Sequence, residues 1–112
     1  MHKVPALVMP LRLDRPPVGE DEAGSVAGYF GSVLPSVWSF QLAARARGLG
    51  SAWTTFHLAH EEAIAELLGI PNSVTQCALL PIAFYKGDSF SPAPRKKASE
   101  ITYLNQWKHS VL

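Results

Sequence analysis

Residues 32–57, SVLPSVWSFQLAARARGLGSAWTTFH, are the stretch that decides the fold. Apolar residues recur at helical spacing from Val33 to Ala46, and they occupy more than one stripe of the expected helix. A helix that is apolar on most of its sides has to be buried on most of its sides. The pattern therefore predicts a helix over residues 33–46 that packs in a core or at a subunit interface.

The ends of this helix are marked by residues suited to helix termini. Pro35 fits the first turn, where a missing N–H group has no cost. Arg45 and Arg47 lie in the last turn, where cations oppose the negative end of the helix dipole. Gly48 can then adopt the left-handed conformation that ends many helices. Residues 52–56, which are rich in aromatic and β-branched side chains, predict a strand directly after this helix.

A chain of 112 residues is long enough for one domain or part of one. We expect a single partial domain over residues 1–112. Charged residues make up 17% of the chain, against about 25% in an average domain, and this thin coat of charge favours oligomerisation. The formal net charge of +1 gives no indication of nucleic-acid binding.

Membrane association and secretion are not expected from the sequence. No apolar run approaches the ~20 residues that a membrane-spanning helix needs. Pro5 and Pro10 interrupt the apolar N-terminal stretch, so we predict no signal peptide. Cys77 is the one cysteine, which excludes an internal disulfide and agrees with a reducing cytosol. We therefore expect a cytoplasmic protein.

The remaining segments alternate between apolar runs and loops. The proline-containing run near the N-terminus predicts an edge strand or a bulge, and the long run before residue 86 predicts a strand buried on both faces. Gly69 is expected to end the second helix. The predicted elements are a strand over 6–9 that extends toward Leu13, a loop over 14–31, a helix over 57–68, a strand over 75–85 and an extended or helical segment over 100–107.

Three groups of reactive side chains have ordinary structural interpretations. His57 and His60 are one helical turn apart and could share a metal ion, but a third ligand at suitable spacing is missing. The acidic run over residues 20–22 lacks the ligand spacing of a cation loop, so a solvated loop tip is favoured. Cys77 lies in a predicted buried strand without a basic neighbour, which favours a core residue over a nucleophile.

The basic triplet Arg95-Lys96-Lys97 has two interpretations. It follows two prolines and a polar loop directly after the predicted buried strand. A rigid loop that carries two or three cations could bind a phosphate group. An ordinary solvated tail is the alternative, and the triplet by itself favours that alternative.

Five stretches, taken in order, resemble the C-terminal half of the nitroreductase family of FMN-dependent NAD(P)H oxidoreductases. No single stretch is specific, but their order and spacing together are. They are VPALV at 4–8, LAARARGLGSAWTT at 42–55, ELLGIP at 66–71, ALLPIA at 78–83 followed by Lys86-Gly87, and the basic triplet at 95–97.

The resemblance implies an α+β fold, a truncated nitroreductase-like sandwich in which a small mixed or antiparallel sheet packs on a long central helix. It implies an intertwined homodimer built on the helix over 33–46, with FMN bound at the subunit interface. Such a flavoprotein passes a hydride from NAD(P)H through the flavin to a nitroaromatic or quinone-like acceptor.

The resemblance also implies which residues hold the cofactor. The residues that match the lining of the flavin ring are Trp53, Thr54, Thr55 and Phe56. Arg95 and Lys97 match the cations that reach the FMN phosphate. No protein side chain is implied as catalytic, because the flavin performs the chemistry.

Two departures from the family keep other functions open. The family's N-terminal half carries an Arg-x-Ser-x-Arg-like clamp for the ribityl chain and phosphate, and we expect no counterpart of it here. Trp38-Ser39 stands where many relatives have Gln-Asn in the central helix. A weak flavin reductase, a non-catalytic module that binds flavin or another phosphoryl ligand, and a homodimeric scaffold remnant are therefore all retained.

Overall fold

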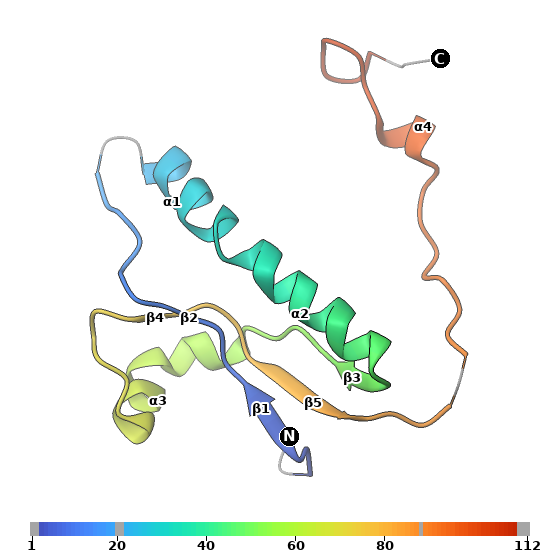
Figure 1. Cartoon of the computed structure of the whole chain (residues 1–112). Coiled ribbons are helices and arrows are strands. Elements are labelled where there is room, and N and C mark those ends of the chain that lie inside the picture. The colour runs from blue at the N-terminus through green and yellow to red at the C-terminus, as the bar shows by residue number, and fades with distance from the viewer. Residues whose placement is uncertain (1–2, 20–21, 88, 110–112) are drawn as a thin grey trace.

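Two small antiparallel sheets lie beside two helices that follow each other end to end (Figure 1). The computed structural model describes residues 3–19, 22–87 and 89–109. The elements are β1 (Ala6–Val8), β2 (Leu11–Arg12), α1 (Glu22–Gly31), α2 (Leu34–Ala46), β3 (Leu49–Ser51), a 3₁₀ turn (Phe56–His60), α3 (Glu61–Leu68), β4 (Thr75–Gln76), β5 (Leu80–Phe84) and α4 (Ala98–Ile101). This arrangement confirms the predicted α+β class with a small antiparallel sheet and a long helix.

Strand β5 is the centre of the larger sheet, which has the strand order β1-β5-β3. The alternate side chains Leu80 and Ile82 of β5 are buried, at 0% and 7% exposure. Together with Val37 of α2 and Ala78 they form the core cluster, and Val8 and Leu49 pack against it. The predicted strand over 75–85 is therefore present in two pieces, β4 and β5.

The predicted N-terminal strand also forms in two pieces, and the break falls at Pro10. Strand β1 pairs with β5 at the edge of the larger sheet, and β2 pairs with β4 in the smaller sheet. Val8 faces Leu80 and Leu11 faces Gln76, so the register shifts by one residue between the two pieces. This shift confirms that Pro10 marks an irregularity in an edge strand.

Helix α2 confirms the predicted helix to within one residue. Val33 precedes its first turn, Pro35 lies inside that turn, and Gly48 follows it in the left-handed conformation with φ of +78°. The expected burial on most sides is not found within one protomer. Val37 and Ala44 are buried, whereas Trp38, Phe40 and Leu42 are exposed by 58%, 39% and 54%.

The predicted loop over 14–31 is wrong, because its second half forms helix α1. Tyr29 is 5% exposed, and its hydroxyl lies 2.8 Å from Thr75 Oγ1 and 2.6 Å from the Asp14 carbonyl. Packing of this kind stabilises a helix despite the glycines that lower its intrinsic propensity. Two residues of the predicted acidic loop tip, Glu20 and Asp21, lie outside the described residues.

The predicted strand over 52–56 is wrong as well, and Pro81 supplies the physical reason. Strand β3 pairs with β5 from Leu49 to Ser51, and a single bridge between Thr54 and Leu79 continues the same register. In that register Ala52 faces Pro81, at a position where the ladder needs an N–H donor. Proline has none, so the ladder is interrupted at Ala52 and Trp53.

The predicted helix over 57–68 begins as a 3₁₀ turn and continues as α3. Glu61 and Glu62 occupy the first turn of α3, and Gly69 ends it with φ of +67°, as predicted. Leu67 and Leu68, which belong to its predicted apolar stripe, are exposed by 82% and 58%. The C-terminal segment forms the short helix α4, which begins two residues before the predicted start and ends at Ile101.

The chain is flat and open, with a long C-terminal segment that leaves the sheet and runs away from it (Figure 1). Its radius of gyration is 18.1 Å, whereas a compact domain of this length has about 13 Å. Its accessible surface is 8875 Å², against about 6,000 Å² for a compact monomer of this mass. Much apolar surface is therefore left uncovered by one copy of the chain. None of the helices in the described ranges could cross a membrane.

Candidate functional site

Thr54 fixes the segment that follows β3 to the sheet. Its backbone exchanges two hydrogen bonds with Leu79, at 3.1 and 2.9 Å, and its hydroxyl donates a third to the Leu79 carbonyl at 2.7 Å. The residues on either side turn outward, since Trp53 is 38% exposed and Phe56 is 89% exposed. The four predicted ring-lining residues thus form one outward-facing segment with a single firm anchor.

This segment offers backbone donors as well as aromatic surface. Among the described residues, the N–H groups of Trp53, Thr55 and Phe56 donate no hydrogen bond to a protein acceptor. The Thr55 carbonyl accepts from Leu58 N at 3.0 Å, which begins the 3₁₀ turn. Unused N–H groups beside an exposed ring can bind the polar edge and the face of a planar ligand.

His57 lies directly behind this segment and faces inward. It is 9% exposed, and neither of its ring nitrogens has a hydrogen-bond partner in the described residues. Burial lowers the pKa of His57, and the nearby Glu61 carboxylate opposes that shift. His60, which the sequence pairs with it as a possible metal ligand, is exposed, so the two side chains have different surroundings.

Glu61 holds the start of α3 against β4. Its carboxylate forms an ion pair with Arg15 at 2.8 Å, and its carbonyl accepts from Gln76 Nε2 at 2.9 Å. The hydrogen bond from Arg15 lowers the pKa of Glu61. Gln76 is 2% exposed, and its Oε1 atom has no partner in the described residues. These contacts hold the start of α3, which directly follows the 3₁₀ turn that begins at Phe56.

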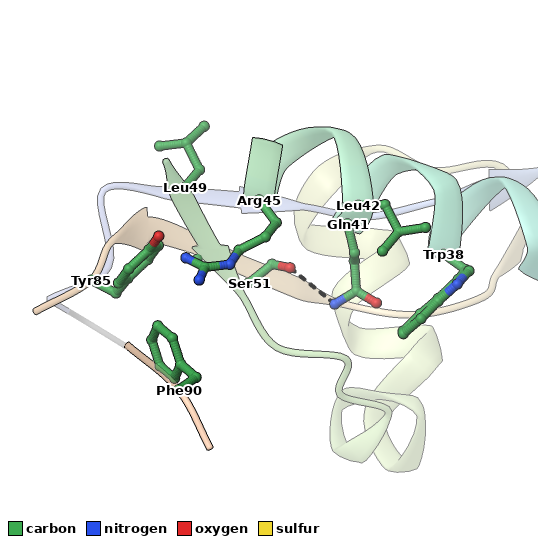
Figure 2. A pocket seen from close by; sticks show the side chains of 9 residues that line it. Trp38, Gln41, Leu42, Arg45, Leu49, Ser51, Tyr85 and Phe90 are labelled. Atoms are coloured by element: carbon green, nitrogen blue, oxygen red, sulfur yellow. Dashed lines mark hydrogen bonds between the residues drawn. The ribbon is translucent and has the colours of Figure 1, made fainter. Parts of the chain in front are cut away.

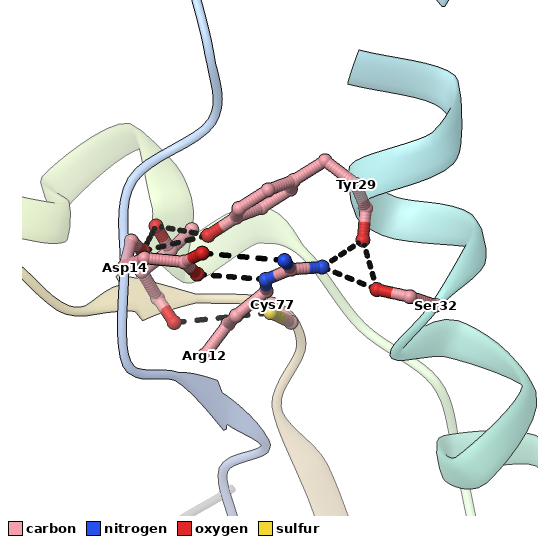
Figure 3. A network of polar contacts seen from close by, with 6 residues as sticks. Arg12, Asp14, Tyr29, Ser32 and Cys77 are labelled. Atoms are coloured by element: carbon pink, nitrogen blue, oxygen red, sulfur yellow. Dashed lines mark hydrogen bonds and ion pairs between the residues drawn. The ribbon is translucent and has the colours of Figure 1, made fainter. Parts of the chain in front are cut away.

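The second polar network joins β2 to the α1–α2 junction (Figure 3). The Arg12 guanidinium pairs with the Asp14 carboxylate at 2.7 Å, donates to the Tyr29 carbonyl at 2.6 Å and contacts the Ser32 hydroxyl. Its Cζ atom also lies 3.9 Å from the centre of the Tyr29 ring. Because four of its five N–H donors form hydrogen bonds inside the protein, this arginine has a structural role.

Cys77 adjoins this network and belongs to the core, as predicted. It is 4% exposed, and its backbone N–H donates to the Pro10 carbonyl at 3.0 Å. Burial raises the pKa of its thiol, so the reactive thiolate form is disfavoured.

The predicted phosphate cations lie on the C-terminal segment. Arg95 and Lys97 are exposed, and Arg95 bonds its preceding neighbour, the Pro94 carbonyl, at 3.0 Å. No hydrogen bond or ion pair in the described ranges joins residues 91–109 to the sheet or to α1–α3. One protomer therefore does not bring the cations to the segment over 53–56.

A groove of about 430 Å³ lies on the flank of α2 (Figure 2). Trp38 and Leu42 form one side, Tyr85 and Phe90 form the other, and Arg45 and Gln41 point into the space between them. Sequence reasoning missed this groove. Its walls come from α2, β3 and the stretch after β5, and no pattern within any one of these segments indicates that they meet.

A sequence profile of the nitroreductase family matches residues 2–83. The chain belongs to the nitroreductase family. The resemblance noted in the sequence is thereby confirmed.

A solved member of the same class shares the fold. The crystal structure of a nitroreductase-like family protein from Bacillus cereus matches with a TM-score of 0.70 and 17% identity, over 92% of this chain and 52% of that one. The chain thus spans about half the length of that nitroreductase-like relative. No curated protein matches it.

Proposed function

We propose that this chain is a nitroreductase-family flavoprotein that binds FMN between two copies of itself and passes a hydride from NAD(P)H to a nitroaromatic or quinone-like acceptor. The observation that carries the proposal is the segment over 53–56. Thr54 anchors it to Leu79, and the free N–H groups of Thr55 and Phe56 lie beside an exposed ring. These groups suit the polar edge and the face of a flavin ring.

The chain has residue types that suit both ends of FMN, the ring and the phosphate. The segment over 53–56 offers donors and apolar surface to the ring, and the exposed Arg95 and Lys97 offer charge to the phosphate. Within one protomer these two sets lie on separate parts of the chain. The proposed site therefore draws its ring-binding segment and its phosphate cations from different copies.

The open shape supports the homodimer. The accessible surface of one chain exceeds that of a compact monomer of the same mass by nearly half. Obligate dimers bury a comparable area at their interfaces. Helix α2 exposes Trp38, Phe40 and Leu42, so its outward side is the proposed contact between copies. Ser39 and Ala43 lie between these side chains and would let two such helices approach closely.

FMN, when bound, supplies the hydride chemistry. The chain's own residues have two tasks. The Thr54 anchor holds the ring-binding segment at a fixed distance from the sheet, and Phe56 excludes water from one side of the ring. Neither task needs a proton from a side chain, because hydride transfer needs only a donor and an acceptor held near contact distance.

A non-catalytic flavin-binding module is the second candidate. It is favoured by the separation of the cations from the ring-binding segment within one chain. Each charge-assisted contact that remains unformed weakens binding by about 1.5–3 kcal/mol. A chain that binds FMN but leaves no room for NAD(P)H would have this function.

Steady-state oxidation of NADH and NADPH at increasing FMN concentration tests the proposed activity. The proposal predicts slow oxidation that saturates at high added FMN. FMN binding without any NAD(P)H oxidation, with menadione and nitrofurazone as acceptors, would assign the chain to the non-catalytic candidate. A Phe56→Ala variant should lower the rate, whereas Phe84→Ala, which removes another exposed phenylalanine, should leave it unchanged.

A further inference from the structure

We propose that His57 is a pH-sensitive switch that controls the position of the ring-binding segment, residues 53–56. In the closed state the neutral imidazole is buried and holds the 3₁₀ turn against the rest of the chain. When the imidazole takes up a proton it swings outward into the open state, and Thr55 and Phe56 move with it, so that FMN binds less tightly. The effect on FMN rests on the proposed function, whereas the movement of the turn does not.

His57 is the side chain that fixes the turn. Over residues 52–64, all of which the structure describes, His57 alone is buried. The turn over Phe56–His60 has no side-chain hydrogen bond at its start, and Leu58 N donates to the Thr55 carbonyl at 3.0 Å. Hydrogen bonds in a 3₁₀ turn have poorer geometry than those in an α-helix. The position of the turn therefore depends on the burial of His57.

Thr55 is placed to act as the hinge. On one side of it, Thr54 is anchored to Leu79 by two backbone bonds and one hydroxyl bond. On the other side lies the buried His57, and Thr55 itself is exposed. A rotation of the backbone at Thr55 can therefore move Phe56 and His57 outward while the anchor stays in place.

The buried position suits a neutral imidazole better than a charged one. Neither ring nitrogen has a hydrogen-bond partner in the described residues. A neutral imidazole leaves one N–H donor unpaired there, whereas an imidazolium leaves two unpaired donors and a buried charge. Gln76 Oε1 is also buried without a partner, but it hydrogen-bonds neither ring nitrogen.

The charged groups around His57 do not replace these missing hydrogen bonds. The Glu61 carboxylate of α3 attracts the imidazolium, and Arg15, from the segment after β2, is paired with that carboxylate at 2.8 Å. Both Glu61 oxygens accept from Arg15, and Oε1 also accepts from Gln76 N at 3.3 Å. The attraction of Glu61 is thus shared with Arg15. Burial accordingly lowers the pKa of His57, although Glu61 opposes the shift.

The difference in pKa couples the opening of the turn to pH. An exposed imidazole has the ordinary pKa of 6.5, so the open state binds the proton more tightly than the closed state does. From about pH 7.5 to 5, the ratio of open to closed molecules should rise by up to about 30-fold. Glu61 stays ionised over this range, because Arg15 lowers its pKa from 4.5.

Hydrogen exchange of single amides in the full chain, without flavin, tests the switch. The Leu58 amide reports on the turn, and the Leu79 amide, which donates to the Thr54 carbonyl at 2.9 Å, reports on the anchor. After correction for the intrinsic exchange rate, protection of Leu58 should fall by up to about 30-fold from pH 7.5 to 5. Low urea should leave Leu58 exchange unchanged and speed up Leu79 exchange, because local opening exposes little surface.

Three variants separate the switch from a general effect of acid. His57→Leu cannot take up a proton, so Leu58 should stay protected at both pH values. His57→Lys places a cation at the same position and should leave Leu58 weakly protected at both. His60→Gln, which replaces the exposed histidine of the same turn, should behave as the wild type does.

Fluorescence titration of FMN measures the consequence for the ligand. The FMN affinity of the wild type is divided by that of His57→Leu at each pH, which cancels the titration of the FMN phosphate, a group that itself ionises near pH 6. This ratio should fall from about pH 7.5 to 5, and by no more than about 30-fold.

Four results would overturn the proposal. Two are Leu58 protection that does not change with pH and Leu58 protection that falls equally in His57→Leu. The third is Leu58 exchange with the urea dependence of Leu79, because the turn would then open only on global unfolding. The fourth is an affinity ratio for FMN that stays constant while the turn opens. Absence of FMN binding at every pH would refute the proposed function, and the exchange measurements would still decide whether the turn opens.

Discussion

Thr54 and Leu79 exchange both of their backbone hydrogen bonds, and the Thr54 hydroxyl adds a third bond to the Leu79 carbonyl at 2.7 Å. This anchor follows two residues that have left the ladder between β3 and β5. Only one paired residue ties the proposed ring-binding segment to the sheet in the described part of the chain. We therefore expect the position of that segment to depend on the Thr54 hydroxyl bond.

Thr54→Val should lower the free energy of unfolding by about 1 kcal/mol, since valine keeps the shape of the side chain but removes the hydroxyl donor. Thr54→Ser keeps the donor and should retain most of the stability. Urea denaturation of the two variants and the wild type measures the effect. Equal stability of all three would show that the hydroxyl bond contributes nothing.

Pro81→Ala should restore the missing rung of the ladder. The new N–H group at position 81 faces the Ala52 carbonyl in the observed register, so it should be protected from hydrogen exchange to a degree similar to that of Leu79. FMN affinity should fall, because Trp53 would be drawn into the strand. Rapid exchange at position 81, with Leu79 still protected, would contradict this explanation of the broken strand.

Pro81 also illustrates how far the sequence could predict the fold. The apolar periodicity of residues 33–46 and the flanking Pro35 and Gly48 predict α2 closely, because all of these are local features. The strand over 52–56 could not be excluded in the same way. Its composition favours a strand, and the residue that prevents the strand lies on a neighbouring strand far along the sequence.

The candidate site was predictable to a similar, partial extent. The segment over 53–56 and the basic triplet could be selected by resemblance, and the structure adds that Thr54 is the anchored member. Helix α1 was missed because Tyr29 is fixed by Asp14 and Thr75, which are distant in sequence. The groove around Arg45 was missed for the same reason, since Tyr85 and Phe90 meet it only in the folded chain.

The chain should sediment as a homodimer, and Trp38→Glu should cause aggregation or unfolding. A charge at this exposed indole would face the apolar surface of the partner's α2. Val18→Glu is the control, because Val18 is 87% exposed in the loop before α1. A folded wild-type monomer in analytical ultracentrifugation would contradict the proposed dimer.

Replacing Arg95 and Lys97 together by alanine should weaken FMN binding by about 2 kcal/mol or more, roughly 30-fold, if both contacts are desolvated. The double replacement of Lys96 and Lys108 by alanine removes the same charge and should have a much smaller effect. Fluorescence titration of FMN compares the two. Unchanged affinity in the Arg95 and Lys97 variant would mean that the triplet is an ordinary solvated segment.

Stability should fall as the pH is lowered from about 7.5 to 5, and His57 should be responsible. Burial places the pKa of His57 in the folded chain below its ordinary value of 6.5. The unfolded chain then binds the proton more tightly than the folded chain does. The contribution of His57 to the free energy of unfolding is therefore complete above pH 6.5 and is lost as the pH falls below that value. Glu61 acts in the same direction only at lower pH, because Arg15 lowers its pKa from 4.5.

Urea denaturation at several pH values measures this dependence. His57→Leu should flatten it between about pH 7.5 and 5, whereas His60→Gln, at an exposed position, should leave it unchanged. A wild-type profile that is already flat in this range would show that the buried imidazole is protonated without cost.

The binding of FMN to the purified chain tests the central claim most directly. Flavin fluorescence should be quenched in a saturable way as the chain is added, and the flavin should co-sediment with the dimer and be released on denaturation. Absence of any binding at millimolar FMN would contradict the account and leave a nitroreductase-like dimer without a flavin.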